Sequence, residues 1–124
     1  MDYKEFRISC KSTKALLIGD LMLDRYVFGK VNRISPEAPV PIFLAKDKKQ
    51  VLGGAGNVFN NLVSLDVNTT LLTVLGNDVT ASHIKKILKS EKKSKSYIFT
   101  EKKISSSKTR YLVNGQQLIR VDEE

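Results

Sequence analysis

The sequence has very few residues of the kinds that form disulfide bonds or bind zinc. Cys10 is its only cysteine and His83 its only histidine. A single cysteine cannot form a disulfide within the chain, and the two residues together fall short of a conventional Cys/His zinc site. The composition therefore excludes a disulfide-stabilised scaffold and a zinc-finger protein, and it indicates a cytoplasmic location.

Long apolar runs are also missing. No stretch approaches the roughly 18 apolar residues that a membrane-spanning helix needs. The N-terminal stretch MDYKEFRISCKSTK mixes charges of both signs and lacks the apolar segment of a secretory signal. Hydrophobic residues nevertheless make up 41% of the 124 positions. We therefore expect one folded domain, without a membrane partner, built around its own core.

Acidic residues are outnumbered, with 13 against 21 basic ones, which gives a formal net charge of +8. The excess lies between residues 85 and 110, and scattered surface lysines of this kind usually form a solvated face. Nucleic-acid binding through the same segment is the alternative, and it predicts an affinity that falls steeply with salt. The basic residues of the segment are Lys85, Lys86, Lys89, Lys92, Lys93, Lys95, Lys102, Lys103, Lys108 and Arg110.

Apolar and β-branched runs predict several strands. Buried strands are expected at residues 15–20 (ALLIGD) and 69–76 (TTLLTVLG), and a further strand at 96–101 (SYIFTE). Between the first two of these, RYVFGK predicts a short strand that ends at Gly29. Val51–Leu52 predicts another short strand, after the polar stretch KDKKQ.

Proline and turn residues predict two antiparallel segments in addition to the buried strands. The only prolines, Pro36, Pro39 and Pro41, fall in RISPEAPVPIFLA. They exclude this segment from the centre of a sheet and favour an edge strand or a flap. Near the C-terminus, Asn114-Gly115 separates two alternating runs, which predicts a hairpin with a type I′ turn.

Helical periodicity begins at Ala55 and ends near residues 66–68, and Asp78 or Thr80 can cap another helix. Strands that alternate with helices indicate βαβ units and a parallel sheet. The predicted fold class is therefore α/β. The first helix has an expected apolar face of Ala55, Val58, Phe59, Leu62 and Val63.

The stretch VLGGAGN, residues 51–57, carries three glycines immediately before the first helix. It lacks the third glycine of a dinucleotide-binding fingerprint and the Gly-Lys-Ser/Thr of a phosphate-binding P-loop. A helix N-terminus followed by the amide of Asn57 suits an oxygen-rich ligand such as a polyol. Asp20 and Asp24 follow the first strand, where ligands gather in open α/β sheets. A tight turn without a ligand remains the alternative.

Three segments together resemble one branch of the ribokinase-like (phosphofructokinase-B, PfkB) sugar kinases. They are LIGDLMLDRYVFGKVNRISPEAPVPIF, GGAGNVFNNLVSLDVNTTLLTVLGND and KTRYLVNGQQLIRVDEE. The sequence is similar here to the N-terminal part of bacterial D-glycero-β-D-manno-heptose 7-phosphate kinases, apart from residues 85–103. The resemblance implies a ribokinase-like α/β domain, of which residues 1–124 form a part, with a small antiparallel β lid at about 26–46 and 108–122.

The resemblance also implies an activity, namely ATP-dependent phosphorylation of a sugar phosphate at its anomeric hydroxyl. The product leads to ADP-heptose and the lipopolysaccharide core. Asp24 matches the family's hydroxyl-binding aspartate, and the paired glycines and asparagine line the sugar site. Ser35 stands near the lid, which often forms a dimer contact in the family. The implied substrate-binding residues are Asp24, Gly53, Gly54, Asn57, Arg33, Lys108 and Arg110. For Lys108 and Arg110 the alternative is that they are edge-strand charges that face water.

Two residues depart from the family pattern. Phe59 replaces a small residue, and it either packs in the core or crowds the sugar. Asp66 replaces a glycine or serine suited to a helix C-terminus. In the family, ATP and Mg²⁺ bind near a downstream GAGD motif that also carries the catalytic base, and this chain has no such motif. No catalytic or metal-binding residue is therefore assigned.

We expect the chain alone to be inactive. It is interpreted as the sugar-binding N-terminal part of a kinase whose C-terminal half is missing. The alternatives are a subunit completed by a separate chain and a non-catalytic gene remnant.

Overall fold

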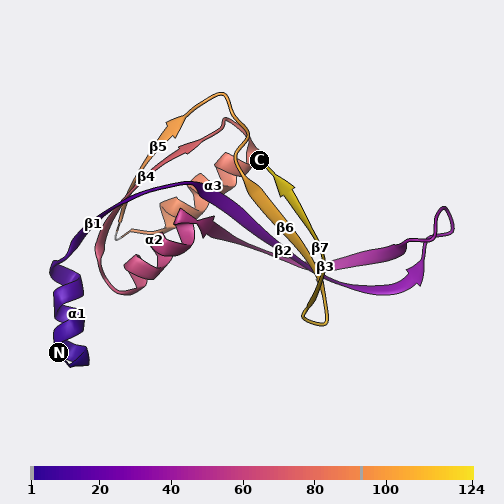
Figure 1. Ribbon diagram of the computed structural model, residues 1–124, viewed down its shortest axis with the longest axis horizontal. Helices are drawn as coiled ribbons and strands as arrows, with labels where there is room; N and C mark the ends of the chain where they lie inside the picture. The colour runs from indigo at the N-terminus through magenta and orange to yellow at the C-terminus, as the bar shows by residue number, and fades with distance from the viewer. Residues whose placement is uncertain (1, 93) are drawn as a thin grey trace.

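The computed structural model describes residues 2–92 and 94–124, which fold into two sheets, two helices that pack against them and an N-terminal helix that projects away from them (Figure 1). Three consecutive strands follow the first helix, strands and helices then alternate over residues 41–100, and a hairpin follows at the C-terminus. The elements are α1 (Tyr3–Ser12), β1 (Lys14–Ile18), β2 (Leu21–Ile34), β3 (Pro41–Gly54), α2 (Ala55–Ser64), β4 (Asn68–Leu75), α3 (Val79–Ser90), β5 (Lys95–Thr100), β6 (Ser107–Val113) and β7 (Gln116–Glu123).

One sheet is parallel and has the order β1-β4-β5. Along β4 the side chains alternate between the two faces, and Leu71 and Leu75 are almost fully buried. They join Phe59 of α2 and Ile84 of α3 in the core. The parallel pairing confirms the expected α/β class with a parallel sheet, and α2 and α3 contribute to one core with the sheet residues Leu17, Leu71 and Ile98.

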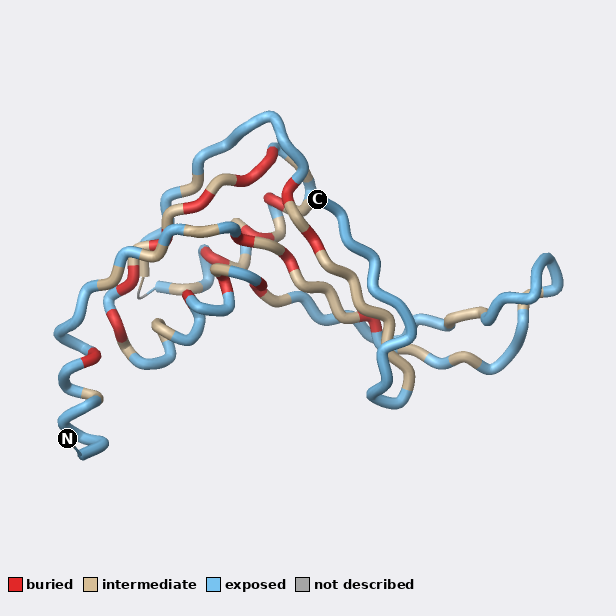
Figure 2. The backbone as a smooth tube through the Cα atoms, viewed as in Figure 1, coloured by how far each residue is buried: buried red, intermediate tan, exposed pale blue. Residues whose placement is uncertain are grey.

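The second sheet is mixed and has the order β3-β2-β6-β7, with β2 and β6 parallel. The predictions of a short strand that ends at Gly29 and of another at Val51–Leu52 were wrong in length. Strands β2 and β3 each continue for 14 residues, and KDKKQ lies within β3. The far part of this hairpin is exposed (Figure 2). Backbone pairing with β2 therefore holds these polar residues in a strand without a buried side-chain pattern, and a register shift at Phe28/Gly29 bends the pair.

Both turn predictions are confirmed. The prolines lie at the tip of the β2–β3 hairpin, where the Ser35 N–H donates to the Val40 carbonyl at 2.8 Å, and Pro41 opens an edge strand. Asn114 and Gly115 both have positive φ, 49° and 82°, as a type I′ turn requires, and they join β6 to β7.

The helices begin close to the expected residues. Asp78 caps α3 by accepting from the Ala81 N–H at 2.7 Å. In α2, Val58 is exposed, although the helical spacing assigned it to the apolar face. Helix α1 was not predicted from the sequence. Its signal was the capping box in which Asp2 accepts from the Glu5 N–H and Glu5 accepts from the Asp2 N–H.

Buried residues gather where α2 and α3 face the two sheets (Figure 2). Within residues 2–92 and 94–124, none of the helices has the length and apolar character needed to cross a membrane.

Candidate functional site

The centre of the candidate site is an ion pair between two neighbouring strands. Arg110 on β6 donates from Nη1 to Oδ1 of Asp24 on β2 at 2.7 Å. The two side chains are only 21% and 16% exposed. In the parallel register Asp24 lies opposite Lys108, and Tyr26 lies opposite Arg110. The arginine therefore reaches back along the strands to meet the carboxylate, and a charge-assisted hydrogen bond fixes both groups.

Tyr26 completes this cluster and was missed from the sequence. The Arg110 guanidinium carbon lies 5.3 Å from the centre of the Tyr26 ring. The Phe28 ring stacks with the same Tyr26 ring, with a centroid distance of 6.5 Å. Alternation along β2 puts Asp24, Tyr26 and Phe28 on one face, and this period of two was the available signal. The hydrogen bond to Asp24 raises the pKa of Arg110, while burial opposes that rise. The guanidinium is thus held charged against both a carboxylate and an aromatic face.

Gly53 makes room for the Asp24 carboxylate. A Cβ atom at Gly53 would lie 2.3 Å from Oδ2 of Asp24, far inside van der Waals contact. Gly54 has φ 58° and ψ −128°, and a Cβ there would lie 2.6 Å from the Asp20 carbonyl oxygen. That carbonyl accepts from the Ala55 N–H at 2.9 Å. The protein's own atoms therefore account for the absence of side chains at both positions.

Asn57 lies in the first turn of α2 and is exposed. The N-cap position of this helix is Gly54, which has no side chain to accept from the first N–H groups. Asn57 and this helix start are thus open to an oxygen-bearing ligand beside the end of β3.

Two further expected residues, Lys108 and Arg33, lie at different distances from Asp24 along the strands. Lys108 is partly buried and lies between Asp24 and Asp122 in the strand register. Arg33, by contrast, is exposed near the far end of β2. At about 3.3 Å per residue it is about 30 Å along the strand from Asp24. Within one chain, Arg33 therefore belongs to the lid tip and not to the Asp24–Arg110 cluster.

Arg25 lies next to Asp24 on β2, and its side chain fixes this strand from the opposite face. Its Nη2 donates to Thr80 Oγ1 of α3 at 2.8 Å, and its Nη1 lies 3.2 Å from both Ser107 Oγ and Glu123 Oε2. Ser107 Oγ also donates to Glu123 at 2.7 Å. One side chain thus joins β2, β6, β7 and α3, and it fixes the position of β2 directly beside Asp24.

The basic segment does not form one continuous patch. Lys86 and Lys89 are exposed on α3, Lys95 begins β5, and Lys102 and Lys103 follow the opposite end of that strand. Arg110 forms an ion pair with Asp24. Lys93, counted in the segment from the sequence, lies outside the described residues. This distribution favours a solvated surface over a nucleic-acid interface.

The two departures from the family pattern have structural explanations. Phe59 is 2% exposed and belongs to the core, so it does not crowd the sugar site. Asp66 adopts a left-handed conformation with φ 61° at the end of α2, and its carboxylate pairs with Arg7 of α1. Helix α1 therefore stabilises the turn in which aspartate replaces the usual small residue.

Among residues 2–92 and 94–124, no three His, Cys, Asp or Glu side chains lie close enough together to hold a metal ion. The chemistry available in the cluster is the recognition of hydroxyls by a carboxylate and of anions by a cation.

Comparison with known proteins identifies relatives over nearly the whole chain. A family described as "pfkB family carbohydrate kinase" matches residues 12–124. The "Bifunctional protein HldE" of Rhodospirillum rubrum is 42% identical over 121 residues, covering 97% of this chain and 24% of that protein. The protein of the same name from Helicobacter pylori is 45% identical over 112 residues, covering 90% of this chain and 24% of its own length. The chain thus spans about a quarter of these relatives.

Solved structures share the fold. A carbohydrate kinase from Agrobacterium tumefaciens superimposes with a TM-score of 0.67 at 20% identity, covering 90% of this chain and 35% of that one. Phosphofructokinase-2 from Escherichia coli, solved with fructose-6-phosphate, gives a TM-score of 0.63 at 20% identity, covering 86% of this chain and 33% of that one. These neighbours confirm the predicted ribokinase-like fold class.

Proposed function

Because the chain belongs to the pfkB family of carbohydrate kinases, we propose that it is the sugar-binding N-terminal part of a heptose 7-phosphate kinase. The observation that carries this proposal is the Asp24–Arg110 pair, held at 2.7 Å beside Gly53. It combines a hydroxyl acceptor and an anion-binding group in one fixed position, which is what a phosphorylated sugar requires.

Each residue of the cluster has a distinct role in this proposal. Asp24 accepts hydrogen bonds from sugar hydroxyls, and Asn57 at the start of α2 supplies an amide to a further hydroxyl. The ion pair occupies one of the five N–H groups of Arg110, and the others are suited to the sugar's phosphate oxygens. Lys108 adds a point charge beside them. Gly53 and Gly54 keep the wall of the site free of side chains.

The proposed reaction of the complete enzyme is phosphorylation of the anomeric hydroxyl by ATP in the cytoplasm. It leads to ADP-heptose for the lipopolysaccharide core. Phosphoryl transfer depends on positioning and on charge stabilisation around the nucleotide and Mg²⁺. This chain contributes the acceptor side, so the isolated 124 residues are expected to bind sugar phosphate and not to transfer phosphate.

Calorimetric titration of the folded chain with D-glycero-D-manno-heptose 7-phosphate tests the proposal. Saturable binding is expected, with at least a tenfold loss of affinity in Asp24→Asn and in Asn57→Ala. Glu101→Gln is the matched control, because Glu101 is an exposed carboxylate outside the cluster. Binding that is unchanged by Asp24→Asn contradicts the assignment. No binding by a chain with native circular dichroism favours a remnant without a working acceptor site.

We further propose that two copies associate through the lid. Phe43 and Tyr111 meet edge-to-face at 5.3 Å and line an apolar groove of about 530 Å³. Leu118, Ile119 and Val121 of β7 complete the groove, and all three are exposed. An exposed apolar patch of this kind marks an interaction surface. Ile119→Asp is expected to shift the chain to a monomer in light scattering, whereas a dimer unaffected by this change would exclude the lid contact.

A further inference from the structure

One face of the mixed sheet carries a row of cations that crosses all four strands. In the strand register Lys49 of β3 lies opposite Tyr26 of β2, Tyr26 lies opposite Arg110 of β6, and Arg110 lies opposite Arg120 of β7. Residues that lie directly opposite each other point to the same face of a sheet. Alternation along β2 places Asp24 on this face too. These four residues, here called the cationic row, therefore lie on the face that bears the candidate site.

The neighbouring row on the same face has alternating charges, whereas the cationic row does not. Asp24 lies opposite Lys108, and Lys108 lies opposite Asp122, so that a carboxylate flanks the lysine on each side. In the cationic row, by contrast, Arg110 and Arg120 lie directly opposite each other. Like charges in this position destabilise a pair of strands. Natural proteins break such local rules mainly at functional sites, so the row is a candidate for binding an anion.

Lys49 differs from the two arginines of the row in its surroundings. Arg110 and Arg120 each form an ion pair with a carboxylate, at 2.7 and 2.9 Å. Within the part of the chain that the structure describes, Lys49 forms no such pair. Asp47, the next residue of β3 on this face, accepts from the Lys48 N–H at 2.8 Å. Lys49 is exposed, so its ammonium group can reach an anion that approaches this face.

The spacing of the row fits a phosphate group held over Tyr26. Lys49 and Arg110 lie on the two strands that flank Tyr26, about 10 Å apart at about 4.8 Å between neighbouring strands. Their long side chains can close on one anion between them, and the Arg110 guanidinium carbon already lies 5.3 Å from the centre of the Tyr26 ring. Along β2, Tyr26 is two residues from Asp24, which is about 7 Å. One monosaccharide spans this distance, with hydroxyls at Asp24 and a terminal phosphate at the row.

We propose that Lys49 is a specificity-determining residue, whose ammonium group binds the terminal phosphate of the sugar together with Arg110. The inference rests on the proposed function, since it takes Asp24 as the acceptor for the hydroxyls. Lysine supplies a point charge and arginine a planar fork, and together they match a phosphate monoester of about −1.5 to −2 charge at pH 7. Arg120 acts through its charge and not by contact, because Asp122 holds its guanidinium. The bound phosphate offsets the repulsion between the two arginines.

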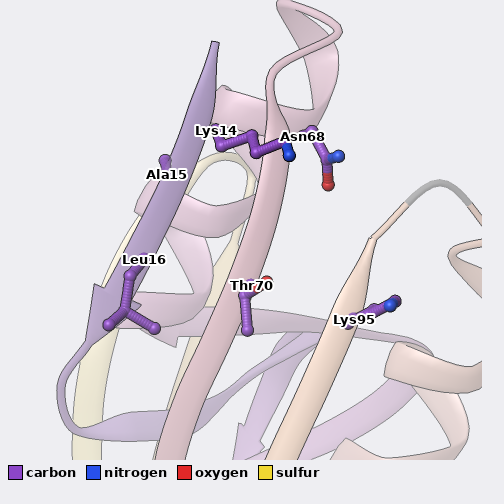
Figure 3. Close-up of a pocket in the computed structure, with 6 residues that line it drawn as sticks. All are labelled: Lys14, Ala15, Leu16, Asn68, Thr70 and Lys95. Carbon is purple, nitrogen blue, oxygen red and sulfur yellow. The ribbon is translucent and has the colours of Figure 1, made fainter.

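A second pair of lysines lines a depression but lacks these features. Lys14 and Lys95, at the N-terminal ends of β1 and β5, border a depression of about 440 Å³ in the parallel sheet (Figure 3). Asn68 lies opposite Lys14 and Thr70 lies opposite Lys95, so the two lysines belong to different rows. The described residues that line the depression include no arginine, aromatic residue or carboxylate. Lys95 therefore serves as a control in the other sheet.

The test is calorimetric titration of the folded chain with two ligands, D-glycero-D-manno-heptose 7-phosphate and the same heptose without phosphate. Lys49→Gln is expected to weaken the binding of the sugar phosphate at least fivefold and to leave the binding of the unphosphorylated heptose unchanged. Lys49→Arg is expected to restore most of the affinity. Lys48→Gln is the matched control, because it removes the same charge from the adjacent position, on the opposite face of β3. Lys95→Gln is the second control.

The outcomes separate this inference from the proposed function. If heptose 7-phosphate binds equally to the wild type and to Lys49→Gln, or if both control variants weaken it as much, the role of Lys49 is overturned while the acceptor site stands. If the wild-type chain binds neither sugar, the proposed function fails, and inorganic phosphate then tests the row by itself. Phosphate is expected to shift the backbone amide NMR signals of Tyr26, Lys49 and Arg110. An absence of shifts, or shifts that persist in Lys49→Gln, overturns the inference.

Discussion

Arg110 Nη1 lies 2.7 Å from Asp24 Oδ1, although 86 positions separate the two residues in the sequence. The contact exists because β6 returns to lie parallel to β2 after the chain has formed β3, α2, β4, α3 and β5. It connects the two segments of the lid at its base.

Arg110→Lys is expected to weaken the cluster although it conserves the charge. Lysine loses the planar guanidinium that contacts both Asp24 and the Tyr26 ring. We expect a loss of about 1 kcal/mol in unfolding free energy, because the pair is partly buried. Heptose 7-phosphate affinity is expected to fall at least fivefold. Arg120→Lys on β7 is the control. Equal losses for the two variants, in urea unfolding and in the sugar titration, would contradict the role of Arg110.

Gly53→Ala is expected to reduce sugar binding more than stability. The added methyl group displaces the Asp24 carboxylate, which belongs to a side chain and not to the backbone, from its position beside Arg110. Unfolding free energy is expected to change by less than about 1 kcal/mol, with at least a tenfold loss of affinity for the sugar phosphate. In an Asp24→Ala background the same change is expected to have little further effect, and additive losses would count against a direct contact.

Gly54→Ala is expected to destabilise the fold itself. Its positive φ is unfavourable for alanine, and the new Cβ would meet the Asp20 carbonyl, which is backbone and cannot rotate away. We expect a loss of about 2 to 3 kcal/mol. Gly115→Ala, also at positive φ but without a described heavy atom within 4 Å of its Cβ, is the control and is expected to cost about 1 kcal/mol. Urea unfolding measures both, and equal losses would exclude the steric contribution.

Asp78→Ala is expected to remove a pH-dependent contribution to stability. Burial raises the pKa of the Asp78 carboxyl, but the N–H groups of Ala81 and Ser105 donate to it and lower the pKa overall. The ionised form therefore stabilises the fold at neutral pH, and this contribution is lost as the pH falls from about 5 through the lowered folded-state pKa.

The Asp78→Ala loss is expected to be about 1 to 2 kcal/mol at pH 7 and to shrink toward pH 2. Urea unfolding at several pH values measures it, with Glu101→Ala as the control. A difference between wild type and variant that stays constant with pH would contradict the assignment.

In the lid, the turns were predictable from the sequence but the full length of the strands was not. The Asn114-Gly115 turn and the proline-bearing tip were predictable, because each depends on backbone angles of two or three residues. The inclusion of KDKKQ in β3 was not, because its strand conformation comes from pairing with β2 over the whole hairpin. A polar, exposed strand leaves no periodic signal in the sequence.

For the functional cluster, the sequence likewise identified single residues but not their contacts. The resemblance selected Asp24, Gly53 and Arg110 separately, but only the structure pairs Arg110 with Asp24 and makes Gly53 the space for the carboxylate. Tyr26 could be assigned to the cluster only once β2 was known, because alternation along that strand places it on the same face as Asp24. Arg33, grouped with them from the sequence, lies instead near the lid tip.

The sequence by itself determined the local elements of this protein, because apolar periodicity, caps and turn residues act over a few positions. It indicated the parallel α/β order, the start of α2 at Ala55 and a cap at Asp78 or Thr80, of which the structure uses Asp78. Only the tertiary structure decided which distant residues meet, as in the contacts Arg110–Asp24 and Arg7–Asp66. Such pairs depend on strand order and register, which are set by burying the whole core together and leave no mark at either residue alone.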